Sequence, residues 1–435
     1  MMRAALLLFL SAAAFAAPRK SVYVEDMEFA LKALEKECGH FFKQKGIDWK
    51  PVRKEFLKSA RKAKNLQDHY ILLIRLLARL RDGHASVRTT AFTKTAQYPD
   101  LQLRRGAGLF FCRNGKKIYV KNAWSNAGRA GIRAGMEVVK IDGTPAGKWL
   151  DMRVETLSDV IGFSTPQHAL FFTCHWGLGG AEGSRVSLEL RTRAKKSKKV
   201  TVMRGKASVV PSGPVVYPKG LTRAGRQSYG KTRDGWGYIH LRDVPRNMLV
   251  QMDTMLKALD NPPGLILDCR ANGGGGTDHD ALLGRFVLKG RKLRRAKAYP
   301  IPSAGETPYG GPVVVIVDAG VRSAGETVSG MFKEDGRAYM IGESPTAGMS
   351  SSKKTIELPS KLFSLYVSVR SNKARFQGGR GIEGIGIIPH EVLPYDPEDL
   401  AAGRDTLIRR AAAILGNFPK GRVPYRPEKQ GWKRD

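Results

Sequence analysis

Two short apolar runs in the second half of this 435-residue chain constrain its fold most strongly. Residues 265–268 read Leu-Ile-Leu-Asp and lead into the glycine-rich loop 272–276. Residues 313–317 consist of valine and isoleucine and lead towards Ser323. Short apolar runs bounded by turns are typical of strands buried on both faces, and strands that alternate with helices favour parallel pairing through crossovers. We therefore predict an α/β core over residues 235–400.

The N-terminus, residues 1–16, is predicted to be a cleavable signal peptide. Arg3 precedes an apolar stretch that is too short to span a membrane as a stable anchor. Ala14-Phe15-Ala16 has the small-x-small pattern of a cleavage site, with cleavage expected after Ala16. No later segment reads as a transmembrane anchor. We therefore expect a periplasmic or secreted protein.

Helical and then strand-like patterns divide the chain on either side of the predicted core. Apolar residues at helical spacing predict an N-terminal helical domain over residues 17–90. Residues 98–150 read as short strands with glycine turns, and residues 151–206 as a β-hairpin extension. Residues 207–234 are rich in Gly, Pro, Ser and basic residues, which indicates either an ordered connector or a flexible linker. Residues 401–435 are expected to form a C-terminal helix and tail.

One part of the strand-rich segment resembles a PDZ domain. From Ala127 to Gly143 the sequence predicts a short helix, a glycine turn, a strand and an Asp-Gly turn, in the spacing typical of that domain. In PDZ domains, the loop before the peptide-binding strand offers N–H groups to a C-terminal carboxylate. Residues 106–110 correspond to that loop. The substrate-binding residues that this resemblance implies are Gly108, Leu109 and Phe110. A generic small β-domain is the alternative.

The charge of the chain is unusual. Its net charge of +35 reflects 74 Lys and Arg residues against 39 Asp and Glu residues. Such a surface favours acidic partners, including acidic envelope polymers, but a basic proteome or compartment also explains the charge and is the interpretation we prefer. No nucleic-acid fold signature accompanies the charge, so we predict no specific nucleic-acid partner.

Neither the cysteines nor the histidines indicate a bound metal. The four cysteines match no metal motif in their spacing, and their pairing cannot be read from the sequence. His279 lies between Asp278 and Asp280, but no partner motif accompanies it and a solvated loop is expected. We predict no metal and no cofactor.

Ser323 is the residue that most directly suggests chemistry. It lies between an apolar strand and a predicted helix, where a serine is either a helix N-cap or an activated nucleophile. The glycines of loop 272–276 let backbone N–H groups approach a ligand oxygen, as an oxyanion hole requires. The helix start adds the N–H of Ala324 and the positive end of the helix dipole. These features favour a nucleophile, with Gly274 and Ala324 as oxyanion-hole residues.

The order of several motifs resembles one protease family. These motifs are Leu-Asp-Cys-Arg-Ala-Asn-Gly-Gly at 267–274, the apolar run 313–317, Ser-Ala-Gly-Glu at 323–326, Ile-Gly-Glu at 341–343, Thr-Ala-Gly at 346–348 and Gly-Ile-Gly-Ile-Ile-Pro at 384–389. Together they resemble the tail-specific (C-terminal processing) proteases, a family that includes the tricorn core protease and retinoid-binding protein modules. The resemblance covers most of the chain after the signal. It implies an α/β crotonase-like core, a PDZ-like domain and serine endopeptidase activity on exported proteins or peptides.

The resemblance also implies how the serine is activated. One branch of the family places a catalytic lysine after a Thr-x-Gly turn, but this chain has Met349 there, and a thioether cannot accept a proton. Lys353 and Lys354 lie near that position; being adjacent in a strand, at most one could face the site. The tricorn-like branch uses a histidine and a glutamate, and their positions correspond to His84 and Glu383. The resemblance therefore implies Ser323 as nucleophile, His84 as general base and Glu383 as the residue that orients it.

The resemblance is incomplete at one position, and two other functions stay open. Tricorn has a serine before its histidine where this chain has Gly83, so that group is either absent or replaced by Ser86. A family member without the lysine could instead be a non-catalytic peptide- or ligand-binding protein. A polyanion-binding envelope protein is a third hypothesis, and it rests on the charge alone.

Overall fold

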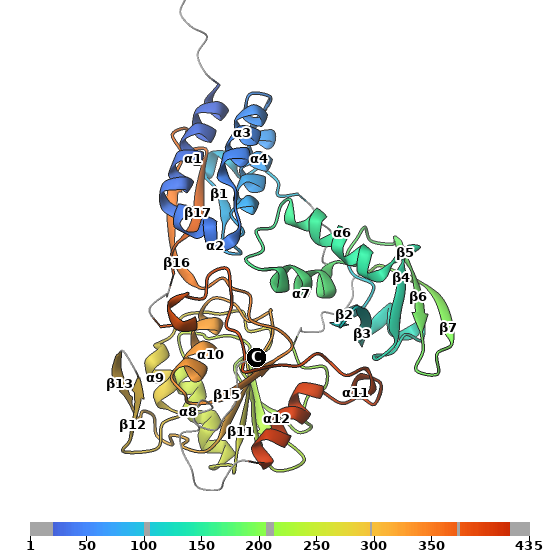
Figure 1. Ribbon diagram of the computed structural model, residues 1–435, viewed down its shortest axis with the longest axis vertical. Coiled ribbons are helices and arrows are strands. Elements are labelled where there is room, and N and C mark those ends of the chain that lie inside the picture. Colours follow the sequence, from blue (N-terminus) through green and yellow to red (C-terminus); the bar gives the residue numbers. More distant parts are fainter. Residues whose placement is uncertain (1–20, 100–104, 206–212, 296–297, 372–374, 418–435) are drawn as a thin grey trace, which may run out of the picture.

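The computed structural model describes residues 21–99, 105–205, 213–295, 298–371 and 375–417. Figure 1 shows a helical unit at the top, a middle unit to one side and an α/β core below. The predicted signal peptide, and the end of the predicted C-terminal tail, lie outside the described residues. No helix in the described ranges is long and apolar enough to cross a membrane.

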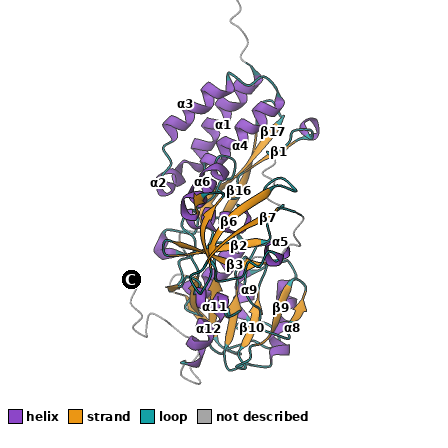
Figure 2. Cartoon of the chain, turned by 90° about the vertical axis from the view of Figure 1, so that its right-hand side faces the viewer, coloured by secondary structure: helices purple, strands orange, loops and turns teal. Residues whose placement is uncertain are grey.

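The helical unit combines N-terminal helices with strands from much later in the chain. Its helices are α1 (Val22–Cys38), α2 (Phe42–Lys45), α3 (Trp49–Ala60) and α4 (Leu66–Arg79), with the 3-10 turns η1 (Gly39–Phe41) and η2 (Ala91–Thr93). They cover an antiparallel sheet in the order β1 (Ser86–Thr89), β17 (Phe363–Ser371), β16 (Ser351–Glu357). Figure 2 shows these helices gathered over β1 and β17.

The two late strands belong to this unit because of what they bury. Phe363, Leu365 and Val367 of β17 are fully buried in one cluster with the helices α1 and α4. Apolar residues alternate along 362–369, a pattern typical of a strand, and these residues lie within the range 235–400 predicted for the core. The apolar face of β17 instead covers the N-terminal helices, a long-range pairing that local periodicity does not reveal.

The middle unit is built on one antiparallel sheet. Its strands follow the order β2 (Leu109–Asn114), β3 (Lys117–Ala123), β4 (Glu137–Ile141), β6 (Arg185–Arg191), β7 (Ser197–Met203), and β5 (Thr144–Pro145) pairs with β4. Its helices are α5 (Ser125–Arg129), α6 (Ala146–Ser158) and α7 (Pro166–Trp176). The hairpin β6–β7 was expected as a separate extension, yet β6 pairs with β4. Val186, Leu188 and Leu190 of β6 are fully buried in the same cluster as β2 and β3, so the hairpin completes this sheet.

The core contains a seven-stranded sheet. Its order is β18 (Glu391–Val392), β15 (Tyr339–Gly342), β14 (Val313–Val317), β11 (Leu265–Asp268), β10 (Gly237–His240), β9 (Gln227–Lys231), β8 (Thr222–Ala224). The strands from β10 to β18 are parallel, which confirms the predicted α/β class. Strands β8 and β9 add an antiparallel edge within residues 207–234, where a connector was expected. Their sequence is mostly polar, so neither shows an apolar run.

Helices cover both faces of the core sheet (Figure 1). One face carries α8 (Met248–Leu259), α9 (His279–Gly284) and α10 (Ala324–Glu334), and the other carries α12 (Thr406–Gly416), preceded by α11 (Pro397–Ala401). The 3-10 turn η3 (Gln377–Gly379) and the hairpin β12 (Lys292–Arg295)–β13 (Ala298–Pro302) lie outside this sheet. Alternate side chains of β14 enter the two apolar clusters, which explains why the run 313–317 is apolar throughout.

Candidate active site

Ser323 lies in a turn that the surrounding structure holds in an unusual conformation. The turn joins β14 to α10, and Ser323 is the N-cap of that helix. Its φ of 57° and ψ of −128° fall in a region that favours glycine, so a serine there is strained. Strain of this kind is common at catalytic residues, because packing elsewhere must maintain it. Ser323 thus lies at the start of the helix, where the sequence predicts it.

The carboxylate of Glu326 organises the backbone around Ser323. Glu326 is fully buried, and its Oε2 accepts the N–H of Ser323 at 3.2 Å and the N–H of Met349 at 2.8 Å. Its Oε1 accepts the hydroxyl of Thr346 and the N–H of Gly348, both at 2.6 Å. Burial raises the pKa of Glu326, while the four donors act in the opposite direction and favour the ionised carboxylate. One carboxylate therefore ties the Thr-Ala-Gly turn to the candidate nucleophile.

The two predicted oxyanion-hole residues differ in whether their N–H groups are available. A Cβ at Gly274 would lie 2.8 Å from the Cβ of Ser323, so this glycine packs directly against the candidate nucleophile. Its N–H, however, already donates to Oδ1 of Asn272 at 2.8 Å. The N–H of Ala324, at the first position of α10, has no acceptor among the described residues, and the same is true of Gly275. Ala324 thus offers a free donor next to Ser323, and Gly275 offers another in the glycine loop.

His84 lies at the end of the turn that follows α4. Its backbone N–H donates to Oδ1 of Asp82 at 2.9 Å, while the other oxygen of that buried carboxylate accepts the N–H of Ser368 at 2.9 Å. The imidazole is partly buried, and its Nδ1 has no hydrogen-bond partner among the described residues. Burial lowers the pKa of His84 to about 4, against the opposing charge of Asp82 and with further lowering by Lys353 and Arg322.

A chain of contacts links the residue before His84 to Ser323. A Cβ at Gly83 would lie 2.6 Å from Sδ of Met349, so the residue before His84 packs against Met349. The N–H of Met349 shares its acceptor oxygen with the N–H of Ser323. Within the described residues, no hydrogen bond joins the hydroxyl of Ser323 to His84. Catalytic hydrogen bonds are often long without substrate and shorten when it binds.

Glu383 does not contact His84 through a hydrogen bond; it pairs with Lys45. The Nζ of Lys45 lies 2.7 Å from Oε1 of Glu383, and both side chains are almost wholly buried. Oε2 of Glu383 has no hydrogen-bond partner in the described part of the chain. Burial raises the pKa of Glu383 to about 7, although Lys45 acts against that rise. The position of Glu383 therefore depends on a lysine of α2 that the sequence did not suggest.

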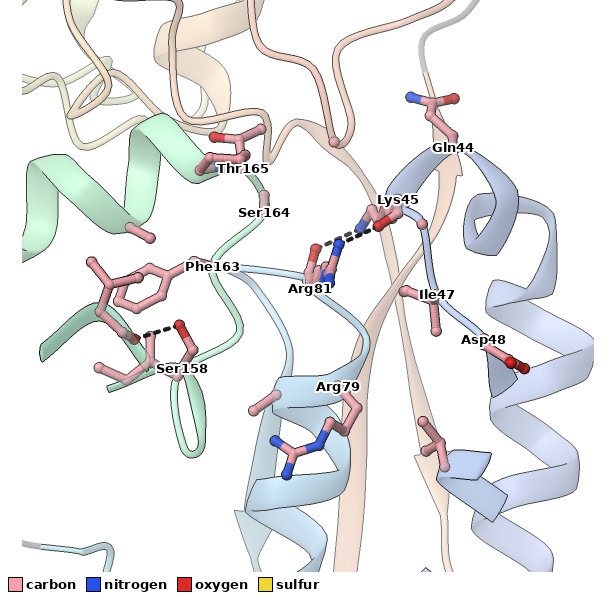
Figure 3. Close-up of a pocket in the computed structure, with 18 residues that line it drawn as sticks. Gln44, Lys45, Ile47, Asp48, Arg79, Arg81, Ser158, Phe163, Ser164 and Thr165 are labelled. Atoms are coloured by element: carbon pink, nitrogen blue, oxygen red, sulfur yellow. Dashed lines mark hydrogen bonds between the residues drawn. The ribbon is translucent and has the colours of Figure 1, made fainter. Parts of the chain in front are cut away.

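Lys45 also connects Glu383 to the turn that carries His84. Its Nζ donates to the carbonyl of Arg81 at 2.8 Å, and Nη1 of Arg81 donates back to the carbonyl of Lys45 at 2.6 Å. Figure 3 shows these reciprocal bonds at the edge of a cavity of about 790 Å³. The cavity is lined by the α2–α3 connection, the end of α4, the α6–α7 region and Gly384, and Ser323 is not part of its wall. It therefore lies beside the Lys45–Glu383 pair.

His168 is a second histidine that sequence reasoning missed. It lies in α7, and a Cβ at Gly83 would come within 3.2 Å of its Cε1. Burial lowers the pKa of His168 to about 4, with smaller contributions from Arg322 and His84. The Thr165-Pro166 start of α7 indicates a helix in the sequence, but nothing local to it indicates proximity to Gly83.

The sequence analysis left open whether a serine or a lysine near His84 takes part in the site. The N–H of Gly83 donates to the hydroxyl of Ser164 at 2.9 Å. Ser86 is exposed at the start of β1. Of the two adjacent lysines, Lys354 lies 2.8 Å from Glu37, whereas Lys353 contributes to the electrostatic environment of His84. Across the described ranges, no group of His, Cys, Asp and Glu side chains could hold a metal ion.

The residues predicted to bind a peptide C-terminus lie in the middle unit. Leu109 and Phe110 begin β2, which is the edge strand of that sheet. Gly108 has a φ of 81°, and a Cβ there would lie 2.4 Å from the carbonyl oxygen of Trp124, so only glycine fits. The N–H groups of Ala107 and Gly108 have no acceptor among the described residues. The loop thus presents free donors beside an unpaired strand edge.

The known proteins that this chain resembles include proteases. Residues 235–393 match the model of peptidase family S41. Tricorn protease homolog 2 of Streptomyces coelicolor is 25% identical over 399 residues, which cover 87% of this chain and 31% of that protein. The carboxyl-terminal-processing protease of Picosynechococcus is 25% identical over 384 residues, which cover 84% of this chain and 83% of that protein. This chain thus spans about a third of the first relative and most of the second.

A solved structure shares the fold over most of the chain. Mature CPAF complexed with lactacystin has a TM-score of 0.63 and 15% sequence identity, and the match covers 90% of this chain and 97% of CPAF. The family match and the carboxyl-terminal-processing relatives identify the protein as a serine peptidase. Within that class, residues 235–393 match peptidase family S41, and these comparisons support the resemblance to the tail-specific proteases seen in the sequence.

Proposed function

We propose that this chain is an exported serine endopeptidase in which Ser323 is the nucleophile, His84 the general base and Glu383 a positioning residue. The observation that carries the proposal is the strained turn of Ser323, packed against Gly274 beside the free N–H of Ala324. Maintaining a serine at a φ of 57° costs free energy, which a purely structural N-cap does not require. Export rests on the N-terminal sequence alone.

The chemistry follows from these positions. The Oγ of Ser323 attacks the carbonyl carbon of the substrate peptide bond, and His84 accepts the hydroxyl proton. The N–H of Ala324, with the free N–H of Gly275 in the glycine loop, stabilises the oxyanion that forms. His84 then donates the proton to the leaving amine, and water hydrolyses the acyl-enzyme by the reverse sequence. His84 must be neutral to act as a base, and its lowered pKa keeps it neutral at pH 7.

Glu383 would act on His84 indirectly. Lys45 bonds both Glu383 and the carbonyl of Arg81, so the ion pair supports the turn that ends at His84. Asp82 bonds the backbone of His84 and is the charge that most favours its protonated form. We infer that Asp82 stabilises the imidazolium during turnover, while Glu383 and Lys45 hold the turn in place.

We further propose that the middle unit captures substrates by a free C-terminus. The free N–H groups of Ala107 and Gly108 could receive a carboxylate, and the edge of β2 could pair with an extended peptide. One peptide in free-acid and amidated forms tests this point. The free acid should bind at least tenfold more tightly, and equal affinities over a range of peptides would count against capture of the C-terminus.

The chain itself offers a matched control for the nucleophile. The pentapeptide Ser-Ala-Gly-Glu-Thr occurs both at Ser323 and at Ser303, but Ser303 lies in a loop after β13. Ser323→Ala should abolish peptide hydrolysis and labelling by a fluorophosphonate, whereas Ser303→Ala should retain both. Circular dichroism should show both variants folded. Normal turnover by purified Ser323→Ala would overturn the proposal, and an inactive wild-type protein that still binds peptide would favour a non-catalytic binding protein.

A further inference from the structure

Arg322, the residue immediately before Ser323, presents a cation at the candidate active site. Its backbone N–H donates to the carbonyl of Asn272 at 3.0 Å, which fixes its main chain against the glycine loop. A Cβ at Gly273 would lie 3.8 Å from Nη2 of Arg322, so the guanidinium lies beside that loop. Arg322 also lowers the pKa of both His84 and His168. Its charge therefore reaches the groups around the candidate base.

This cation has no acidic partner within the described residues. The side chain of Arg322 is exposed, and no carboxylate or carbonyl accepts a hydrogen bond from its guanidinium. By contrast, Arg270 of the core bonds Asp268 at 2.6 Å and Asp405 at 2.8 Å. Partial desolvation of the side chain lowers the pKa of Arg322.

The acidic groups of the site are already engaged. Glu383 pairs with Lys45, Asp82 accepts two backbone N–H groups, and Glu326 accepts four donors. None of them is left to neutralise Arg322. Lys353, whose charge also lowers the pKa of His84, likewise forms no ion pair with a described residue. The site therefore has an uncompensated positive charge beside the scissile position.

We infer that Arg322 selects substrates that carry a carboxylate next to the scissile bond. This inference rests on the proposed function and adds the substrate class to it. Two sources supply that chemistry: an Asp or Glu side chain adjacent to the cleaved bond, or a free C-terminal carboxylate close to it. A guanidinium can bond either one through two parallel N–H···O contacts. The net charge of +35 acts in the same direction, because it attracts acidic substrates before they bind.

The test compares matched peptides with the wild type, Arg322→Gln and a control. One peptide pair is amidated and differs only as Asp against Asn beside the cleaved bond. A second pair has a neutral sequence and differs only as free acid against amide. Arg223→Gln is the control, because Arg223 is also exposed but lies on the edge strand β8. Assays are run on the high-pH plateau, so that any change in the pKa of His84 does not affect the comparison.

For at least one pair, the wild type should prefer the carboxylate substrate by about 10- to 100-fold in kcat/KM, the range expected for a partly desolvated charge pair. Arg322→Gln should reduce that ratio to about 1 and leave kcat/KM for the neutral substrate within about threefold. Arg223→Gln should keep the wild-type ratio. The pair that responds identifies the source of the carboxylate. The inference would be overturned if Arg322→Gln lowered kcat/KM equally for both members of each pair, or if it left the wild-type carboxylate preference unchanged.

Binding separates this inference from the proposed function. The same peptides are titrated onto Ser323→Ala and onto Ser323→Ala with Arg322→Gln, where no turnover is needed. A carboxylate preference that disappears with Arg322 supports the inference even if the protein proves not to hydrolyse peptides. Turnover that depends on Ser323 but shows no carboxylate preference supports the proposed function and refutes the role of Arg322.

Discussion

The Nζ of Lys45 lies 2.7 Å from Oε1 of Glu383, and the two side chains are only 2% and 0% exposed. This pair joins α2 of the helical unit to the loop after η3 of the core. It therefore couples the unit that supplies His84 to the part of the chain that supplies Ser323.

Removal of one partner of the buried pair should lower the free energy of unfolding. Lys45→Met leaves the carboxyl of Glu383 buried without its cation, so we expect unfolding in urea to show a loss of about 3–5 kcal/mol. The double variant with Glu383→Gln removes the uncompensated group and should recover part of that loss. Lys50→Met, at an exposed position of α3, is the control and should change stability by less than about 0.5 kcal/mol. Additive losses in the double variant would mean that the two residues are not coupled.

The pH dependence of kcat/KM should report the environment of His84. Because the neutral imidazole is the active base, kcat/KM should rise with pH through an apparent pKa below the usual 6.5. Lys353→Met removes a cation that disfavours the protonated ring, so the apparent pKa should increase. Lys354→Met should leave it unchanged, because Lys354 pairs with Glu37 instead.

The same profiles separate a histidine base from a lysine base. His84→Ala should reduce kcat/KM on the order of a thousandfold. If Lys353→Met were inactive while His84→Ala approached wild-type rates, Lys353 would be the base and the assignment of His84 would fail. A rise centred at or above pH 6.5 in the wild type would contradict the burial of His84 described above.

Glu326→Gln should lower both the stability and the activity of the protein. Both of its oxygens accept hydrogen bonds only, so the NH₂ group of Glu326→Gln would face donors in either orientation. We expect a loss of about 2–4 kcal/mol in stability and at least a tenfold fall in kcat/KM, since buried donors lose their acceptor. Glu334→Gln, at the other end of α10 and paired with Lys333, is the matched control and should be nearly silent. Wild-type activity in Glu326→Gln would show that the carboxylate does not shape the site.

Local sequence was sufficient to predict the elements whose apolar residues, turns and caps lie next to one another in the chain. The strands β11 and β14 and the start of α10 were predicted because apolar runs, glycine turns and a capping serine lie next to one another in the chain. The places of β16 and β17 were not predictable in this way. Their partners in the helical unit are separated from them by several hundred residues, as in the pairing of Ser86 with Tyr366. Periodicity reports which face is buried, but not what covers it.

In the candidate site, too, some residues were predictable from local sequence and others were not. Motif order indicated Ser323, His84 and Glu383, because each lies in a recognisable local pattern. Lys45 and His168 carry no such pattern, and only the packing of α2 and α7 places them beside Glu383 and Gly83.

The repeated pentapeptide shows that the same local sequence can adopt two different conformations. Ser303 and Ser323 begin the same five residues, Ser-Ala-Gly-Glu-Thr. Only the second becomes the N-cap of an α-helix with a positive φ. The sequence by itself determined that a serine follows the apolar run 313–317. The tertiary structure decided its conformation, because the strain at Ser323 is maintained by contacts with Glu326 and Gly274, and residues adjacent in the chain cannot supply such contacts alone.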